Sequence, residues 1–266
     1  MKSQIFFREL KDQRNMLISW FVSISLFILS AMALYHFVIA TGKFNLNDMF
    51  ANLPIFLHKF FGVNLFDTSI ALEYYGTIFL VLSVLMSIFS VTLGVSLITK
   101  SEKNKTADIL HTKPISRSQI LRSKLKLAFA GITVFSLIIF GVSLLAMCYF
   151  VSFDSCVLYV LDLSLALYLL QLIFCASAVA VASLTKKASS ARIIVAAFVI
   201  IFFAIAVLTD ALNIPLLHYF TPFQYFSAKD ILKTGFDWIY GIAAGVKFIV
   251  FIFIAFKAYK YRSIKA

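Results

Sequence analysis

Charged residues are scarce in this sequence. Only 14% of the 266 residues are Asp, Glu, Lys or Arg, whereas 62% are hydrophobic. A soluble domain usually has about 25% charged and about 45–50% apolar residues. One core of this size cannot bury so much apolar surface. The composition therefore excludes a disordered chain and a conventional soluble enzyme, and it favours a polytopic α-helical membrane protein.

Proline, cysteine and alternating polarity are also rare. None of the four prolines interrupts the centre of an apolar run. Within these runs apolar residues follow one another without a break and do not alternate with polar ones, which excludes a β-barrel of the outer-membrane type. Three cysteines are too few for a disulfide scaffold and have no metal-ligand spacing. We interpret Cys148, Cys156 and Cys175 as small apolar residues of the interior.

Motifs of nucleotide binding and of catalysis are missing as well. The nine glycines form no G-x-x-x-x-G-K-[ST] loop, so we expect no ATP site and no cofactor on this chain. Gly94-Val-Ser96 and Gly141-Val-Ser143 lack the second glycine of a nucleophile elbow, and no H-E-x-x-H is present. These absences argue against an intramembrane enzyme and against a metal site.

Long uncharged stretches predict an all-α fold with six transmembrane helices, each near or above the ~20 residues that a crossing needs. Span five is short, so we expect its ends to extend beyond the run. The expected spans lie within Asn15–Gly42, Tyr74–Thr99, Leu127–Phe153, Leu163–Thr185, Ile193–Thr209 and Trp238–Phe256.

The positive charge is unevenly distributed among the loops. The net charge of +12 would suggest a nucleic-acid partner in a soluble protein. Here most of the 24 Lys and Arg residues fall before span one, between spans two and three, between spans four and five, and in the C-terminal tail. By the positive-inside rule, both termini are cytoplasmic and no nucleic acid is involved.

Two non-spanning segments of this single transmembrane domain, residues 1–266, are unusually apolar. Residues 1–14 place Phe6, Phe7 and Leu10 among charges, which predicts an interfacial helix on the inner leaflet; the alternative is a polar leader that only sets topology. Residues 210–237 are rich in aromatics and contain Pro215 and Pro222. We expect this outer segment to dip into the outer leaflet or to pack on the bundle as a broken helical pair.

The loop of residues 100–126 is more structured than topology alone requires. A helix-forming stretch is stopped by Pro114, and Ser116 with Gln119 forms a capping-box pattern. We expect the next helix to begin at Arg117 and to run directly into span three. Two spans would then continue beyond the membrane and present a rigid knob to a cytoplasmic partner.

This loop resembles the signature of ABC-2 type permeases, the membrane subunits of bacterial ATP-binding-cassette exporters. The departures are Lys105 where glycine is usual, Ile115 for valine, and Arg122-Ser123 before the final lysine. Six spans, the N-terminal helix and the outer segment extend the resemblance to the whole chain. The matching positions are Glu102, Thr106, Asp108, Leu110, Pro114, Ser116, Arg117 and Lys124.

The resemblance implies a mechanism. Such permeases pair as homodimers or heterodimers in the bacterial cytoplasmic membrane, and each docks on a separate ATPase subunit that holds ATP and Mg. The cargo would be hydrophobic or amphipathic, a peptide or antibiotic above all. Thr106, Asp108, Ile109, Leu110 and His111 would form the docking knob, with Glu102 and Pro114 shaping it. Arg117 and Lys124 would anchor the next helix to the membrane face or to the partner. For the cations of this loop, the alternative is that they only set the orientation of the chain in the membrane. For the whole chain, the alternative is an accessory subunit that does not transport.

Lys247 interrupts span six near its middle. A charge at that depth costs ~2.5–3.5 kcal/mol on insertion scales, so it should face protein or water. It lines the translocation path or pairs with an acid such as Asp162 or Glu73; alternatively, span six is tilted and shifted and Lys247 snorkels.

Overall fold

The computed structural model describes residues 2–39, 70–103, 117–185, 188–212 and 221–261. This part of the chain is helical and contains no strand, which confirms the predicted all-α class. Six of its helices are long and apolar enough to cross a membrane. The elements are α1 (Lys2–Leu34), a π-helical turn η1 (Tyr35–Ile39), α4 (Ala71–Lys103), α6 (Arg117–Cys148), α7 (Phe153–Leu184), α8 (Ala188–Leu212), a 3₁₀ turn η2 (Gln224–Phe226), α10 (Ala228–Thr234) and α11 (Trp238–Tyr261).

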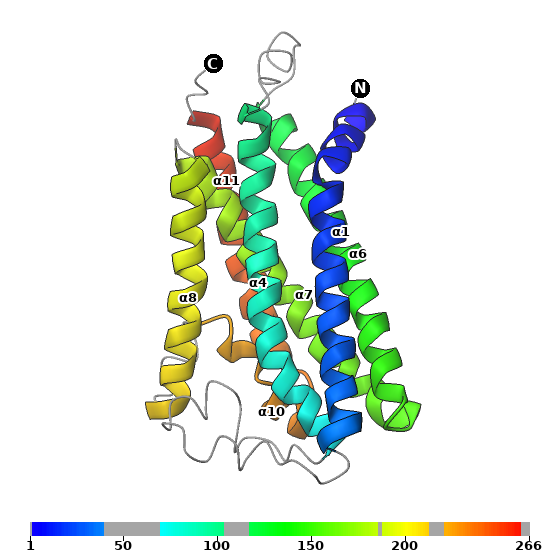
Figure 1. Cartoon of the computed structure of the whole chain (residues 1–266). Helices are drawn as coiled ribbons and strands as arrows, with labels where there is room; N and C mark the ends of the chain where they lie inside the picture. Colours follow the sequence, from blue (N-terminus) through cyan, green and yellow to red (C-terminus); the bar gives the residue numbers. More distant parts are fainter. Residues whose placement is uncertain (1, 40–69, 104–116, 186–187, 213–220, 262–266) are drawn as a thin grey trace.

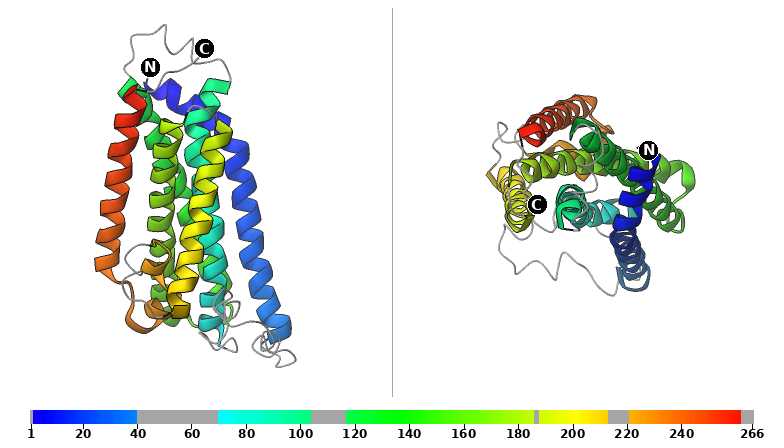
Figure 2. Two further views of the ribbon diagram at one scale, coloured as in Figure 1. Left: turned by 90° about the vertical axis from the view of Figure 1, so that its left-hand side faces the viewer. Right: turned by 90° about the horizontal axis from the view of Figure 1, so that it is seen from above.

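The two helices α4 and α7 form the centre of the bundle (Figures 1 and 2). In their most apolar stretches 67% and 78% of residues are buried, against 11% in α11. Gly94 of α4 explains the close contact, because a Cβ atom there would lie 2.8 Å from both the Ala178 Cβ and the Cys175 carbonyl oxygen of α7. Helix backbones approach this closely only where a side chain is absent.

Polar contacts join the two central helices to each other and to α1. Gln171 of α7 is fully buried, and its amide donates to the Met86 sulfur of α4 over 3.4 Å. The Tyr74 hydroxyl of α4 donates to the Ala31 carbonyl of α1 over 3.0 Å. In an apolar surrounding such bonds fix which helices are neighbours, because an unpaired polar group would be costly there.

The expected span positions agree with the structure, and the helices are longer than the apolar runs. The helix α6 begins at Arg117 and continues without a break, as predicted. α8 extends beyond its short run at both ends, also as predicted. α7 begins at Phe153, ten residues before the run that starts at Leu163, because Asp154 and Asp162 limit the apolar stretch and not the helix.

Both ends of the described chain lie at one end of the bundle (Figures 1 and 2). We call this the inner end, following the charge bias. Residues 2–14 are not a separate helix, because they are continuous with span one in α1. Figure 2 shows that the first turns of α1 lie across the inner end while the rest runs along the bundle axis. The interfacial role of these turns stays a prediction.

Candidate functional site

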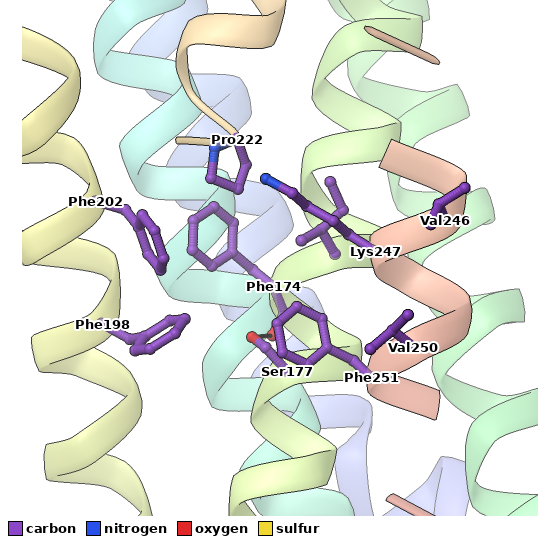
Figure 3. A pocket seen from close by; sticks show the side chains of 10 residues that line it. Phe174, Ser177, Phe198, Phe202, Pro222, Val246, Lys247, Val250 and Phe251 are labelled. Carbon is purple, nitrogen blue, oxygen red and sulfur yellow. Dashed lines mark hydrogen bonds between the residues drawn. The ribbon is translucent and has the colours of Figure 1, made fainter. Parts of the chain in front are cut away.

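A cavity of about 280 Å³ lies between three helices, and we call it the α7–α8–α11 pocket. Figure 3 shows α7 as its floor, α8 and α11 as its walls, and Pro222 at one end. Its volume is close to the lower end of the ~300–1,000 Å³ typical of small-molecule sites. The lining residues are Ile173, Phe174, Ser177, Phe198, Phe202, Pro222, Val246, Lys247, Val250 and Phe251.

Lys247 is the charged residue among these ten. Its side chain is half-buried, and its Nζ lies 4.4 Å from the centre of the Tyr225 ring. An ammonium this close to an aromatic face is attracted by the ring quadrupole. Tyr225 in turn stacks on Tyr240 of α11, with 5.3 Å between ring centres and 17° between planes. The ammonium is thus directed into the bundle, towards Pro222 and the pocket (Figure 3).

The segment of residues 221–226 brings Tyr225 to this position. It belongs to the predicted outer segment, and Thr221, Gln224, Tyr225 and Phe226 are all buried. The Gln224 amide donates to the Ala206 carbonyl of α8 over 2.6 Å. Non-helical backbone at membrane depth is tolerated where protein buries it, and this segment meets that condition.

Phe223 of the same segment packs between α7 and α8. Its ring centre lies 5.2 Å from that of Phe174 in α7 and 5.4 Å from that of Phe203 in α8. The 3₁₀ turn η2 and the short α10 follow, and Gly235 ends α10 with φ 76°, a left-handed conformation that glycine adopts without strain. The described part of the outer segment therefore consists of a 3₁₀ turn and one short helix packed on the bundle. A dip into the outer leaflet stays a prediction.

Helix geometry places the pocket near the middle of the bundle. Lys247 is nine residues from Trp238 and fourteen from Tyr261 in α11, so at 1.5 Å per residue it lies about 13 Å from one end of the helix and about 21 Å from the other. Its Nζ lies over Tyr225, which stacks on Tyr240, a residue nearer the Trp238 end of α11. Both the path-lining and the snorkelling alternatives stay predictions.

The two acids proposed as partners of Lys247 lie on other helices. Asp162 of α7 accepts a hydrogen bond from the backbone amide of Phe236, at the turn that leads into α11. Glu73 lies in the first turn of α4. An ion pair between Lys247 and either acid stays a prediction.

At the inner end, Lys124 and Arg117 contact the chain itself. Lys124 is 2% exposed, and its ammonium donates to the Leu97 carbonyl of α4. Arg117 donates to the Lys260 carbonyl over 3.3 Å, and this carbonyl is one of the last of α11 that the helix leaves unsatisfied. The Lys124 side chain is thus turned towards α4, and its anchoring role stays a prediction.

The rest of the predicted docking site lies outside the described residues. These positions are Thr106, Asp108, Ile109, Leu110, His111 and Pro114, and Ser116 of the capping box is beside them. Glu102 lies in the last turn of α4, and Phe6 and Phe7 lie in the first turns of α1. Leu10 of α1 is 36% exposed.

Sequence reasoning singled out Lys247 but missed the residues around it. Tyr225, Phe174 and Phe202 belong to three separate segments, and no local pattern joins them. The signal that was available is the aromatic content of residues 210–237, which exceeds what a solvent-exposed loop requires.

Comparison with known proteins identifies one family. The family model described as "Multidrug efflux system permease Rv1217c, C-terminal domain" matches residues 9–260, nearly the whole chain. No curated protein matches the sequence.

Proposed function

The chain belongs to the family of the multidrug efflux system permease Rv1217c, C-terminal domain, and from this premise we propose that it is the membrane subunit of an ATP-binding-cassette exporter. The family makes it an integral membrane transport protein rather than an enzyme. The match over residues 9–260 carries the proposal, because it includes all six membrane-spanning helices.

The energy for export comes from a separate subunit in this proposal. The sequence has no phosphate-binding loop, so ATP and Mg are held by an ATPase partner. The loop of residues 100–126 docks on that partner, and its two flanking helices transmit the movement. The geometry supports this role, because α6 begins at Arg117 as one rigid helix of 32 residues. Lys124 ties it to α4 at the inner end, so the two helices would move together.

Two further features complete the proposal. A second permease copy, identical or paralogous, pairs with this chain in the bacterial cytoplasmic membrane. The cargo is hydrophobic or amphipathic, an antibiotic or peptide, and it passes through the α7–α8–α11 pocket. The support for the cargo class is the pocket itself, where Lys247 and Ser177 are the polar members of an otherwise apolar lining.

Purification of the tagged chain from native membranes tests the proposal. Wild-type protein in mild detergent should retain an ATPase subunit that mass spectrometry identifies by its phosphate-binding loop. The variant with Asp108, Ile109 and Leu110 changed to Ala should lose that subunit. A variant with Ile193, Ile201 and Leu208 of α8 changed to Ala is the control, because these side chains are exposed on the bundle's side.

Each outcome of this purification has a definite meaning. Absence of an ATPase from the wild type would overturn the exporter assignment in favour of an accessory subunit. An ATPase that the docking variant retains would preserve the exporter and overturn the docking site.

A further inference from the structure

The α7–α8–α11 pocket combines an apolar lining with one ammonium group. We propose that it binds the charged end of an amphipathic anion, with Lys247 as counter-ion and the apolar body against Phe198, Phe202 and Phe251. This inference rests on the proposed export function and specifies its cargo.

The sign of the preferred charge follows from burial. An anion that leaves water for an apolar cavity needs a counter-ion or hydrogen-bond donors, since desolvation is otherwise uncompensated. Lys247 supplies a charge with three donors at the edge of the cavity. A cationic amphiphile would be repelled by the same group, and an uncharged one could gain at most the weaker hydrogen bond of a neutral acceptor.

The position of the ammonium also favours a ligand role. Its Nζ lies 4.4 Å from the centre of the Tyr225 ring, a contact that holds the side chain at the edge of the pocket. The Tyr225–Tyr240 stack fixes the ring in turn. The site is thus preorganised, which lowers the entropy cost of binding.

A matched pair of fluorescent probes tests the charge preference. Dansylundecanoic acid and its methyl ester share one apolar body and differ in charge. The purified permease complex should bind the acid about tenfold tighter than the ester, because the acid alone meets its counter-ion. Lys247→Met should reduce that ratio to about one while ester binding persists, and Lys247→Arg should keep it. Lys257→Met is the control, because it removes an exposed cation from the same helix outside the pocket.

Three results would overturn the inference. One is equal affinity of the wild type for acid and ester, and another is a preference that survives in Lys247→Met. The third is displacement of the acid by phosphatidylglycerol in mixed micelles, which would make the occupant a bilayer lipid rather than cargo. If the complex still contains its ATPase but binds the acid and the ester equally well, the inference about the pocket fails while the exporter assignment stands.

A second inference concerns two cysteines at the outer turn between α6 and α7. Their sulfur atoms are 3.7 Å apart. From the sequence we interpret both cysteines only as small apolar residues of the interior. Cys148 ends α6 and is exposed, whereas Cys156 in the first turns of α7 is fully buried. The turn is held tightly, since the amides of Phe150 and Val151 both donate to the Met147 carbonyl. Formation of a disulfide bond of about 2.0 Å would bring the two sulfur atoms about 1.7 Å closer.

We infer that Cys148 and Cys156 form a reversible disulfide under oxidising conditions. The charge bias places this turn on the outer side of the membrane, where disulfides persist. The Cys148 thiolate attacks an external disulfide, forms a mixed disulfide and releases one thiolate. The Cys156 thiolate then attacks the Cys148 sulfur and releases the second thiolate. Two protons from the protein thiols go to the two released thiolates, so one disulfide is reduced as one is formed.

Oxidised glutathione tests this order in native membranes. Mass spectrometry of the Cys175→Ser protein should show loss of both thiols without a retained adduct, and dithiothreitol should restore both. Cys156→Ser should keep a glutathione adduct on Cys148, because no second thiol resolves it. Cys148→Ser should leave the buried Cys156 unmodified. Two unmodified thiols after oxidation of the Cys175→Ser protein, or a bond between two chains instead of within one, would overturn the inference.

Discussion

The two sides of α7 differ in how closely their neighbours approach. On one side α4 packs so tightly that a single Cβ at Gly94 would meet the α7 backbone at 2.8 Å. On the other side α8 and α11 leave a cavity of about 280 Å³. Close-packed helices transmit strain and resist rearrangement, whereas a cavity between helices can admit a ligand. α7 is therefore closely packed on the side of α4 and forms the floor of the α7–α8–α11 pocket on the other side.

The largest effect is expected from breaking the tight side. Gly94→Ala should lower the free energy of unfolding by about 3 kcal/mol, the upper end for overpacking, because a backbone carbonyl is among the groups it meets. Thermal unfolding in detergent measures this. Gly245→Ala in α11 is the control, since nothing lies within 4 Å of its added Cβ. Equal melting temperatures for the two variants would mean that α4 and α7 are not held at Gly94.

Lys124→Met tests whether close packing extends to the inner end. The variant removes the donor to Leu97 and should cost about 2 kcal/mol, as for other hydrogen bonds of charged groups. Lys126→Met is the control, because it removes a lysine from the same helix whose side chain is exposed to solvent, whereas that of Lys124 is buried. The same unfolding assay applies, and an unchanged melting temperature for Lys124→Met would show that this lysine does not stabilise the contact between α6 and α4.

Val250→Trp should close the pocket on the open side. Val250 is 49% exposed and lines the cavity, so a tryptophan can fill it without overpacking the core. We expect efflux of an amphipathic dye from cells to fall about tenfold, equivalent to about 1.4 kcal/mol, with unchanged melting temperature. Ile249→Trp is the matched control, since Ile249 is exposed on the same helix and does not line the pocket. Equal efflux by both variants would remove the pocket from the path.

The smallest effect concerns the segment that closes one end of the pocket. Gln224→Leu removes the bond to the Ala206 carbonyl and should cost about 1 kcal/mol. Hydrogen exchange should become faster in residues 221–226, while the centre of α7 keeps its protection. Thr234→Val is the control, because the exposed Thr234 hydroxyl bonds only within α10. Unchanged exchange in Gln224→Leu would show that other contacts hold this segment.

The sequence allowed the prediction of spans and helix starts, which are determined within one segment of the chain. Contacts between distant segments could not be predicted from it. Apolar runs gave the six spans, and the start of α6 at Arg117 followed from local capping signals. The position of Lys247 in a span was visible, but Tyr225 as its neighbour was not. Lys247 follows Tyr225 by 22 positions, and the short helix α10 lies between them in the chain. Periodicity describes one helix at a time, whereas helix contacts depend on shape, as Gly94 shows.

Lys124 illustrates a second kind of information that the sequence does not contain. The positive-inside rule counts cations near a membrane interface and does not distinguish exposed from buried ones. Lys124 is 2% exposed, and its ammonium donates to the Leu97 carbonyl of α4. Charge counting predicts an orientation and does not predict this contact between α6 and α4.

Transport by proteoliposomes tests whether the chain exports an amphipathic anion through the α7–α8–α11 pocket at the expense of ATP. The permease is reconstituted with its copurified ATPase, and movement of an amphipathic fluorescent anion is followed with and without Mg-ATP. We expect transport that requires Mg-ATP, falls about tenfold in Val250→Trp, and is unchanged in Ile249→Trp. Transport that proceeds equally without Mg-ATP, or that Val250→Trp leaves intact, would contradict this mechanism.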